Sequence, residues 1–352
     1  MKILKNDIFI KACKRKPVER TPIWVMRQAG RYLPEYREIR KKYDFLTMCK
    51  TPELASEVTI QPVNLINVDA AILFSDILVI PEAMGLELKI LENKGPVFLN
   101  PVRDKNDFLN LKKINPFKDL KYVLDSITIT KNILNGEVPL IGFSGSPWTL
   151  LTYMIEGGSS KNFGKVKKLI YDEPDFAHLI LDFLADAVTD YLNAKIETGV
   201  DAVQIFDTWG GILSPDMFNE FSLNYIKKII SGIKIKDKPV IVFSKGAYFA
   251  LENIAESGAD VIGLDWTSDI GNVRKRIGEK AALQGNLDPA VLYASIDKIR
   301  KEASKIIDSF GYGSGHIFNL GHGIHPDTNP DNLKELVRFV KQYSVKYHKS
   351  EN

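Results

Sequence analysis

The sequence predicts an α/β protein of the (β/α)8 TIM barrel class. Eight short apolar runs alternate with segments of helical spacing along the whole chain, which is the pattern of parallel α/β folds. Several runs are almost continuously apolar, as expected of strands buried on both faces. An open doubly wound sheet is the alternative, but no G-x-G-x-x-G motif follows a predicted strand to support it. We expect one barrel domain over residues 1–352.

The predicted strands can be placed one by one from these apolar runs. They cover residues 22–26, 70–75, 139–143, 202–206, 239–243, 261–264, 281–284 and 316–320. Between them, apolar side chains at helical spacing predict helices over residues 174–195, 216–230, 247–257 and 330–347.

The stretch from residue 77 to residue 138 is too long for one crossover between neighbouring strands. Residues 86–90 and 96–99 flank Asn93, Lys94 and Gly95, which predicts a small inserted hairpin. A helix near residues 120–134 should follow it.

Composition and charge exclude several classes of function. The chain is 45% hydrophobic and 26% charged, with a net charge of +3, which gives no support to nucleic-acid binding or to a polybasic membrane anchor. We read no secretory signal at the start and no apolar run long enough to span a bilayer. Cys13 and Cys49 have neither metal-binding nor disulfide-framework spacing. We therefore expect a cytoplasmic protein with reduced thiols.

Arginine is concentrated in one short stretch of a chain that otherwise uses lysine. Only 11 of the 47 basic residues are arginine, and six of these lie between Arg15 and Arg40. Arg27 and Arg31 come where the first predicted strand ends, and a guanidinium grips carboxylates or phosphates with a planar fork. Ligand contacts of barrel enzymes lie at strand ends, so we interpret these two arginines as ligand-binding residues.

Polar, aromatic and glycine residues also follow the other predicted strands. They are Asp76, residues 144–148, residues 207–211, residues 244–246, residues 265–266, residues 285–288 and residues 321–323. Because the strands of a barrel all point the same way, we expect these residues to line one site. Asp76 is the carboxylate we favour there, since residues 77–81 are a weak helix start for it to cap. His322, between two glycines, is the histidine we favour.

Three single residues leave alternatives open. Tyr153, one turn into the helix after the third strand, belongs either to the core or to the site. Lys245 ends the fifth strand and raises a Schiff-base aldolase hypothesis that no other residue supports. Asp207 could ligate a metal, but no second histidine or carboxylate lies at ligand spacing, so we expect no metal.

Residues 27–35, Arg-Gln-Ala-Gly-Arg-Tyr-Leu-Pro-Glu, resemble the N-terminal signature of the uroporphyrinogen decarboxylase family. Residues 142–150 resemble its second signature, and residues 206–211, 284–289 and 319–324 match in order, so the resemblance covers essentially the whole chain. It implies a homodimeric (β/α)8 barrel and a carboxy-lyase of porphyrin (haem) biosynthesis. Such an enzyme removes the four acetate carboxyl groups of uroporphyrinogen III without metal or organic cofactor, giving coproporphyrinogen III and CO2.

The resemblance also implies the residues of the site. Catalytic roles would fall to Asp76, Arg27, Tyr153 and His322. Asp76 would bind the pyrrole N–H groups of the substrate. The full set of substrate-binding residues would be Arg27, Gln28, Ala29, Gly30, Arg31, Asp76, Tyr153, Thr208 and His322.

Two other functions were weighed. A cobalamin-related methyltransferase of the same barrel superfamily would use zinc held by thiolate and histidine, yet Cys13 and Cys49 lie away from the predicted strand ends. A non-catalytic tetrapyrrole carrier would keep the arginines but would not need Asp76.

Overall fold

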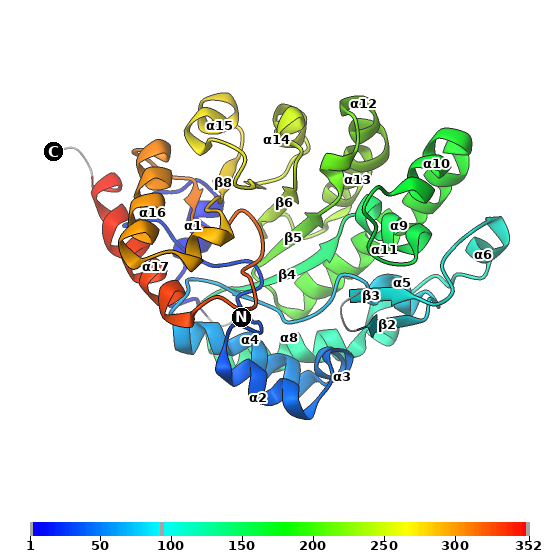
Figure 1. Cartoon of the computed structure of the whole chain (residues 1–352), viewed down its shortest axis with the longest axis horizontal. Coiled ribbons are helices and arrows are strands. Elements are labelled where there is room, and N and C mark those ends of the chain that lie inside the picture. The colour runs from blue at the N-terminus through cyan, green and yellow to red at the C-terminus, as the bar shows by residue number, and fades with distance from the viewer. Residues whose placement is uncertain (1–2, 92–94, 350–352) are drawn as a thin grey trace.

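The computed structural model describes residues 3–91 and 95–349. Within these residues one curved sheet contains seven strands, which follow one another in sequence order and are surrounded by helices (Figure 1). All neighbouring strands in it are parallel, which confirms the predicted α/β barrel pattern. These strands are β1 (Ala71–Ile72), β4 (Leu140–Gly145), β5 (Ala202–Asp207), β6 (Val240–Ser244), β7 (Val261–Gly263), β8 (Ala282–Gln284) and β9 (His316–Ile317).

Residues 22–26 close the barrel between β9 and β1. Ile23 forms a parallel bridge with Phe318, just beyond β9. On its other side, the Ile23 carbonyl accepts a hydrogen bond of 2.8 Å from the N–H of Asp69, ahead of β1. The eighth position of the barrel is therefore filled by this segment.

The segment 22–26 nevertheless forms a single bridge where we expected a full strand. Side-chain amides take the place of the strand ladder here, because the N–H of Val25 donates to Gln28 Oε1 and the N–H of Met26 donates to Asn319 Oδ1, each at 3.0 Å. The strands β1 and β9 are likewise shorter than predicted.

The α-helices surround the sheet. Several of them begin with a proline that follows a capping side chain; in the helix after β4, for example, Ser146 is the cap and Pro147 the first helical residue. They are α1 (Ile8–Cys13), α2 (Pro34–Lys42), α3 (Phe45–Lys50), α4 (Pro52–Ile66), α5 (Val79–Ala83), α6 (Lys105–Leu109), α7 (Pro116–Asp119), α8 (Lys121–Leu134), α9 (Pro147–Glu156), α10 (Gly164–Asp172), α11 (Pro174–Thr198), α12 (Pro215–Phe218), α13 (Asn224–Gly232), α14 (Leu251–Ala255), α15 (Ile270–Ile277), α16 (Ile296–Phe310) and α17 (Pro330–Tyr343). None of the helices in the described part of the chain has an apolar run that could cross a lipid bilayer.

Shorter helical turns also occur in the described residues. They are the 3-10 turns η1 (Gly210–Ile212), η3 (Tyr248–Ala250), η4 (Pro289–Tyr293) and η5 (Ser344–Tyr347) and the π-helical turn η2 (Asn219–Leu223). The helix predicted over residues 216–230 is divided by η2, and the one predicted over residues 247–257 consists of η3 and α14.

The inserted hairpin lies between β1 and β4, beside the barrel (Figure 1). Its strands β2 (Leu88–Leu91) and β3 (Gly95–Phe98) pair antiparallel, as predicted, while Asn93 and Lys94 of the expected turn lie outside the described residues. The N–H of Phe98 donates to the carbonyl of Gly157 at 2.9 Å, which fastens the hairpin to the end of α9.

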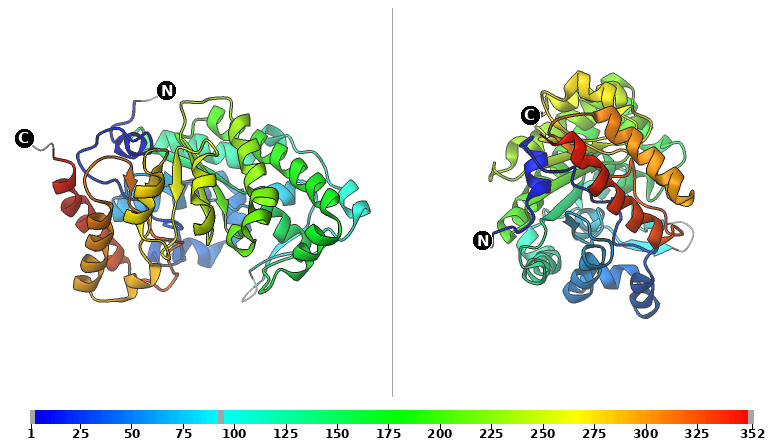
Figure 2. Two further views of the ribbon diagram at one scale, coloured as in Figure 1. Left: turned by 90° about the horizontal axis from the view of Figure 1, so that it is seen from above. Right: turned by 90° about the vertical axis from the view of Figure 1, so that its left-hand side faces the viewer.

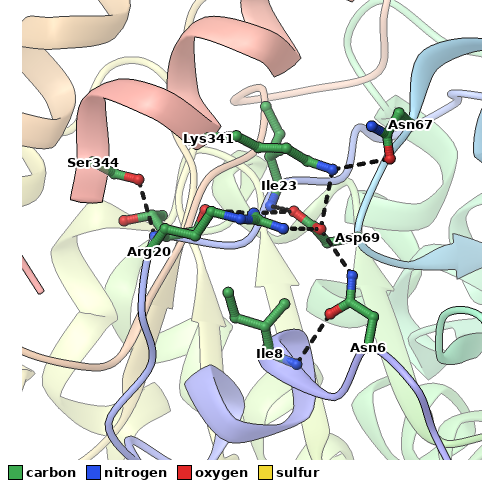
Figure 3. A network of polar contacts seen from close by, with 9 residues as sticks. Asn6, Ile8, Arg20, Ile23, Asn67, Asp69, Lys341 and Ser344 are labelled. Carbon is green, nitrogen blue, oxygen red and sulfur yellow. Dashed lines mark hydrogen bonds and ion pairs between the residues drawn. The ribbon is translucent and has the colours of Figure 1, made fainter.

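A buried ion-pair network ties the beginning of the chain to its last helix (Figure 3). Asp69 is fully buried and accepts two hydrogen bonds of 2.7 Å from Arg20 and one of 3.0 Å from Asn6. Lys341 of α17 lies 3.3 Å from the same carboxylate. Burial alone would raise the pKa of Asp69, but the Arg20 guanidinium outweighs it and lowers that pKa. The first and last helices accordingly lie at the same end of the molecule (Figure 2).

Candidate active site

The loops that follow the strands pack closely against one another at one end of the barrel. Glycines lie at the contacts, where there is no room for a side chain. A Cβ on Gly211, after β5, would strike the backbone of the loop after β6. A Cβ on Gly321 would strike the backbone at Trp266, after β7, and one on Gly323 would overlap the side chain of Arg27. The glycine tracts of the sequence thus let the loops approach closely and form a continuous rim.

Arg27 stands on this rim at the end of the barrel-closing segment. Its backbone has a φ of 62°, a left-handed conformation that costs a non-glycine residue about 1–3 kcal/mol. The side chain is exposed and passes over Gly323. Burial raises the pKa values of Asp76 and Tyr153 and lowers that of His322, and the charge of Arg27 acts to lower the pKa of all three groups.

Gln28 has a structural role in this fold. Its side chain is fully buried, Oε1 accepts from the N–H of Val25, and Nε2 donates to the carbonyl of Ala70 at 3.0 Å. The amide therefore joins the closing segment to the neighbouring strand β1. Oε1 and one N–H of Nε2 are thus bound to backbone, and the expectation that Gln28 holds a substrate carboxylate stays a prediction.

The rest of the arginine motif forms an open loop before α2. Ala29 and Gly30 are half-buried, and Arg31 is exposed. A Cβ on Gly30 would come within 2.9 Å of the Arg27 carbonyl oxygen, so glycine keeps this turn tight. Arg31 lies exposed in this loop, whereas the side chain of Arg27 packs over Gly323.

Asp76 is half-buried after β1, and its Oδ1 accepts a hydrogen bond of 2.7 Å from the N–H of Leu78. The side chain forms a local turn with Leu78 and does not cap α5. Burial raises the pKa of the Asp76 carboxyl, while the Leu78 N–H and the Arg27 charge act in the opposite direction. Its Oδ2 has no hydrogen-bond donor among the residues that the structure describes.

Tyr153 and His322 both follow this carboxylate in the sequence, and the charge of Arg27 acts on both side chains. Both side chains are half-buried, and the Tyr153 ring lies 6.3 Å from the Trp209 ring. Burial raises the pKa of Tyr153 and lowers that of His322 to about 4, so Tyr153 is protonated and His322 is a neutral imidazole near neutral pH. The charges of Asp76 and Arg27 both act on Tyr153, and its place in the site stays a prediction.

Thr208 is half-buried and follows a carboxylate that sequence reasoning had considered only as a metal ligand. Asp207 is fully buried and accepts hydrogen bonds from four hydroxyl groups, two from the start of α9 and one each from η2 and β6, at 2.6 to 3.3 Å. These hydroxyls belong to Ser146, Thr149, Ser222 and Ser244. Asp207 therefore joins the ends of β4, β5 and β6, and the serines after the predicted strands were the signal for it.

The donor groups for a metal ion are not gathered here. Over residues 3–91 and 95–349, no group of three or more His, Cys, Asp or Glu side chains could hold one. Cys13 and Cys49 are both buried, and burial raises the pKa of each thiol, so neither is a ready thiolate ligand.

An arginine whose charge acts on a half-buried carboxylate at the strand ends of a barrel is typical of an enzyme with a site for an anionic ligand. Residues 4–343 match the uroporphyrinogen decarboxylase family. The chain is 57% identical over 341 residues to the uroporphyrinogen decarboxylase of Ruthia magnifica, covering 96% of this chain and 98% of that one. It is 54% identical over 351 residues to that of Hydrogenovibrio crunogenus, covering 98% and 99%. The chain belongs to the uroporphyrinogen decarboxylase family.

Solved structures agree on the fold. A methyltransferase from Methanosarcina mazei superposes with a TM-score of 0.82 at 22% identity, covering 97% of this chain and 99% of that one. At this level of identity the likeness concerns the fold alone.

Proposed function

We propose that this protein is a uroporphyrinogen decarboxylase that removes the four acetate carboxyl groups of uroporphyrinogen III as CO2 and yields coproporphyrinogen III. The family match over residues 4–343 supports the reaction. The observation that carries the assignment to this site is that the charge of Arg27, on the rim, acts on Asp76, Tyr153 and His322.

Loss of CO2 from an acetate on a pyrrole requires an electron sink. Protonation of the ring carbon next to nitrogen creates one, because the nitrogen then carries positive charge. The electron pair of the breaking C–CO2 bond moves into this cation, CO2 leaves, and a second proton on the exocyclic carbon gives a methyl group. When the ring carbon then loses its added proton, the net change is uptake of one proton per carboxylate lost.

Asp76 suits the stabilisation of that cation. An ionised carboxylate placed against the pyrrole N–H groups stabilises positive charge as it develops, and such fixed charges act strongly where water is excluded. The nearby Arg27 favours the ionised form of Asp76 despite its burial.

The remaining groups divide between binding and proton supply. Arg27 and Arg31 offer guanidinium forks to the carboxylates of the substrate. Tyr153 keeps its proton near neutral pH and can donate it, while the neutral His322 can donate or accept a hydrogen bond without adding charge.

Anaerobic turnover of uroporphyrinogen by the purified protein tests this function. We expect stepwise formation of coproporphyrinogen with release of CO2. Binding without CO2 release would favour the tetrapyrrole carrier, and methyl transfer that depends on added zinc would favour the methyltransferase.

From the family we also propose that the protein works as a cytoplasmic homodimer, as one barrel domain over residues 1–352 and without cofactor. Size-exclusion chromatography with light scattering tests the homodimer. Recovery of the activity in the supernatant after high-speed centrifugation of a cell lysate tests the cytoplasmic location.

A further inference from the structure

Lys245 is a strand-end residue that the sequence analysis singled out and that the proposed function does not use. It follows β6 directly, and its backbone N–H and carbonyl are both hydrogen-bonded to residues at the end of β5 and in the loop after it. Its N–H donates to the Asp207 carbonyl at 3.3 Å, and its carbonyl accepts from Gly211 at 3.0 Å. The side chain is half-buried, so its stem starts from a rigid point on the wall of the site.

The ammonium group of Lys245 has no acidic partner. Among the residues that the structure describes, none forms an ion pair with it, in contrast to many surface lysines of this chain. The nearest strand end supplies Asp265, whose Oδ1 accepts from Thr267 and whose Oδ2 accepts from the N–H of Gly246 at 2.6 Å. Asp207 is already bound by four hydroxyls.

The position of this unpaired cation is defined by two neighbours. Its Nζ lies 5.7 Å from the centre of the Trp266 ring, a distance at which an aromatic face attracts a cation. Its charge, together with that of Arg27, lowers the pKa of His322. Since Arg27 and Lys245 come from different strand ends and both act on His322, the two cations lie around the same imidazole.

We propose that Lys245 binds a carboxylate of the substrate and is a third cationic residue of the site, together with Arg27 and Arg31. The inference rests on the proposed function, because the carboxylate belongs to a side arm of uroporphyrinogen. A lysine suits this role: its ammonium is a point charge on a flexible stem, so it can follow different side arms as the substrate turns between successive decarboxylations. The Schiff-base hypothesis for Lys245 is not needed.

Steady-state kinetics of Lys245→Gln with uroporphyrinogen test the proposal, with Lys238→Gln as a matched control. Lys238 is also half-buried and precedes the same strand, at the opposite end of the barrel. We expect Lys245→Gln to raise KM about 10-fold, the usual effect of losing one charge-assisted hydrogen bond, and to change kcat less. Lys245→Arg should restore most of the affinity, and kcat/KM of Lys245→Gln should depend less steeply on salt than that of the wild type.

The possible outcomes are distinguishable. A Lys245→Gln variant with the KM and salt dependence of Lys238→Gln, alongside an active wild type, overturns the inference and leaves the proposed function intact. A wild type that does not convert uroporphyrinogen overturns both. Because no hydrogen bond of the ammonium to a described residue is lost, the thermal unfolding temperature should not change, and equal unfolding temperatures exclude misfolding as the cause.

Discussion

At the scale of a single residue, the ionised form of Asp76 lowers the stability of the folded protein, although the proposed reaction needs this form. Burial raises its pKa, so the ionised form costs the folded state free energy that the unfolded chain does not lose. This cost is present above the folded pKa and vanishes as the pH falls below the unfolded value.

We predict that Asp76→Asn lowers turnover by about 10²–10³-fold, the usual effect of removing one electrostatic contact of this kind. Near neutral pH its unfolding temperature should equal or exceed that of the wild type, and the two should converge in acid. Activity assays and calorimetry at both pH values check this. Wild-type turnover in the variant would contradict the role in cation stabilisation.

Arg27 and Arg31 should respond differently to replacement by lysine, which keeps the charge and loses the planar fork. Arg27 is held on the rim near Asp76, whereas Arg31 is exposed in the loop beyond. We predict that Arg31→Lys chiefly raises KM, and that Arg27→Lys also lowers kcat, since misplacement by about 1 Å can cost on the order of 10²-fold. Steady-state kinetics, with circular dichroism as a folding control, decide. Small and equal effects of both substitutions on KM and kcat would mean that other residues bind the substrate carboxylates.

At the scale of elements, the close packing of the loops determines the positions of the side chains on the rim. The clearest case is Gly323, in the loop after β9, whose missing side chain leaves room for Arg27. A Cβ there would lie 2.7 Å from Arg27 Cγ and 2.9 Å from Arg27 Nε, far inside normal contact.

We predict that Gly323→Ala displaces Arg27 and lowers kcat/KM by about 10- to 100-fold while the barrel stays folded. Gly164→Ala is the control, because a Cβ at this first residue of α10 meets only Asn162, at 3.8 Å. If Arg27 carries the effect, Gly323→Ala should add little in an Arg27→Lys background. Additive losses would show that the loop matters for another reason.

At the scale of the whole molecule, Asp69 is the counterpart of Asp76 at the other end of the same strand region. It binds Arg20 before the barrel-closing segment and Lys341 on α17, so it holds the two ends of the chain together. Its pKa is lowered, so its stabilising effect is present above the unfolded pKa and is lost as the pH falls through the folded one.

We predict that Asp69→Asn destabilises the protein by on the order of 3 kcal/mol near neutral pH, because it leaves the half-buried Arg20 without its carboxylate partner. Urea unfolding measures this, and the difference from the wild type should disappear in strong acid. The kcat of the folded variant should match the wild type. A variant as stable as the wild type at neutral pH would show that the network contributes nothing net.

The sequence by itself determined the barrel class, the inserted hairpin and the strand ends that carry Arg27, Asp76, Thr208 and His322. These follow from local patterns, since the period of apolar residues marks strands and the fold places all strand ends on one side. No local pattern in the sequence predicts the left-handed backbone conformation of Arg27.

Only the tertiary structure decided which side chains are available to a ligand. Gln28 belongs to the same motif as Arg27, yet its amide is taken by the backbone of the barrel-closing segment and β1. Asp207 follows a strand as Asp76 does, yet four hydroxyls surround it, and Lys245 is left without a partner. Residues far apart in sequence compete for the same hydrogen bonds, and closure of the barrel, which no local spacing encodes, decides the result.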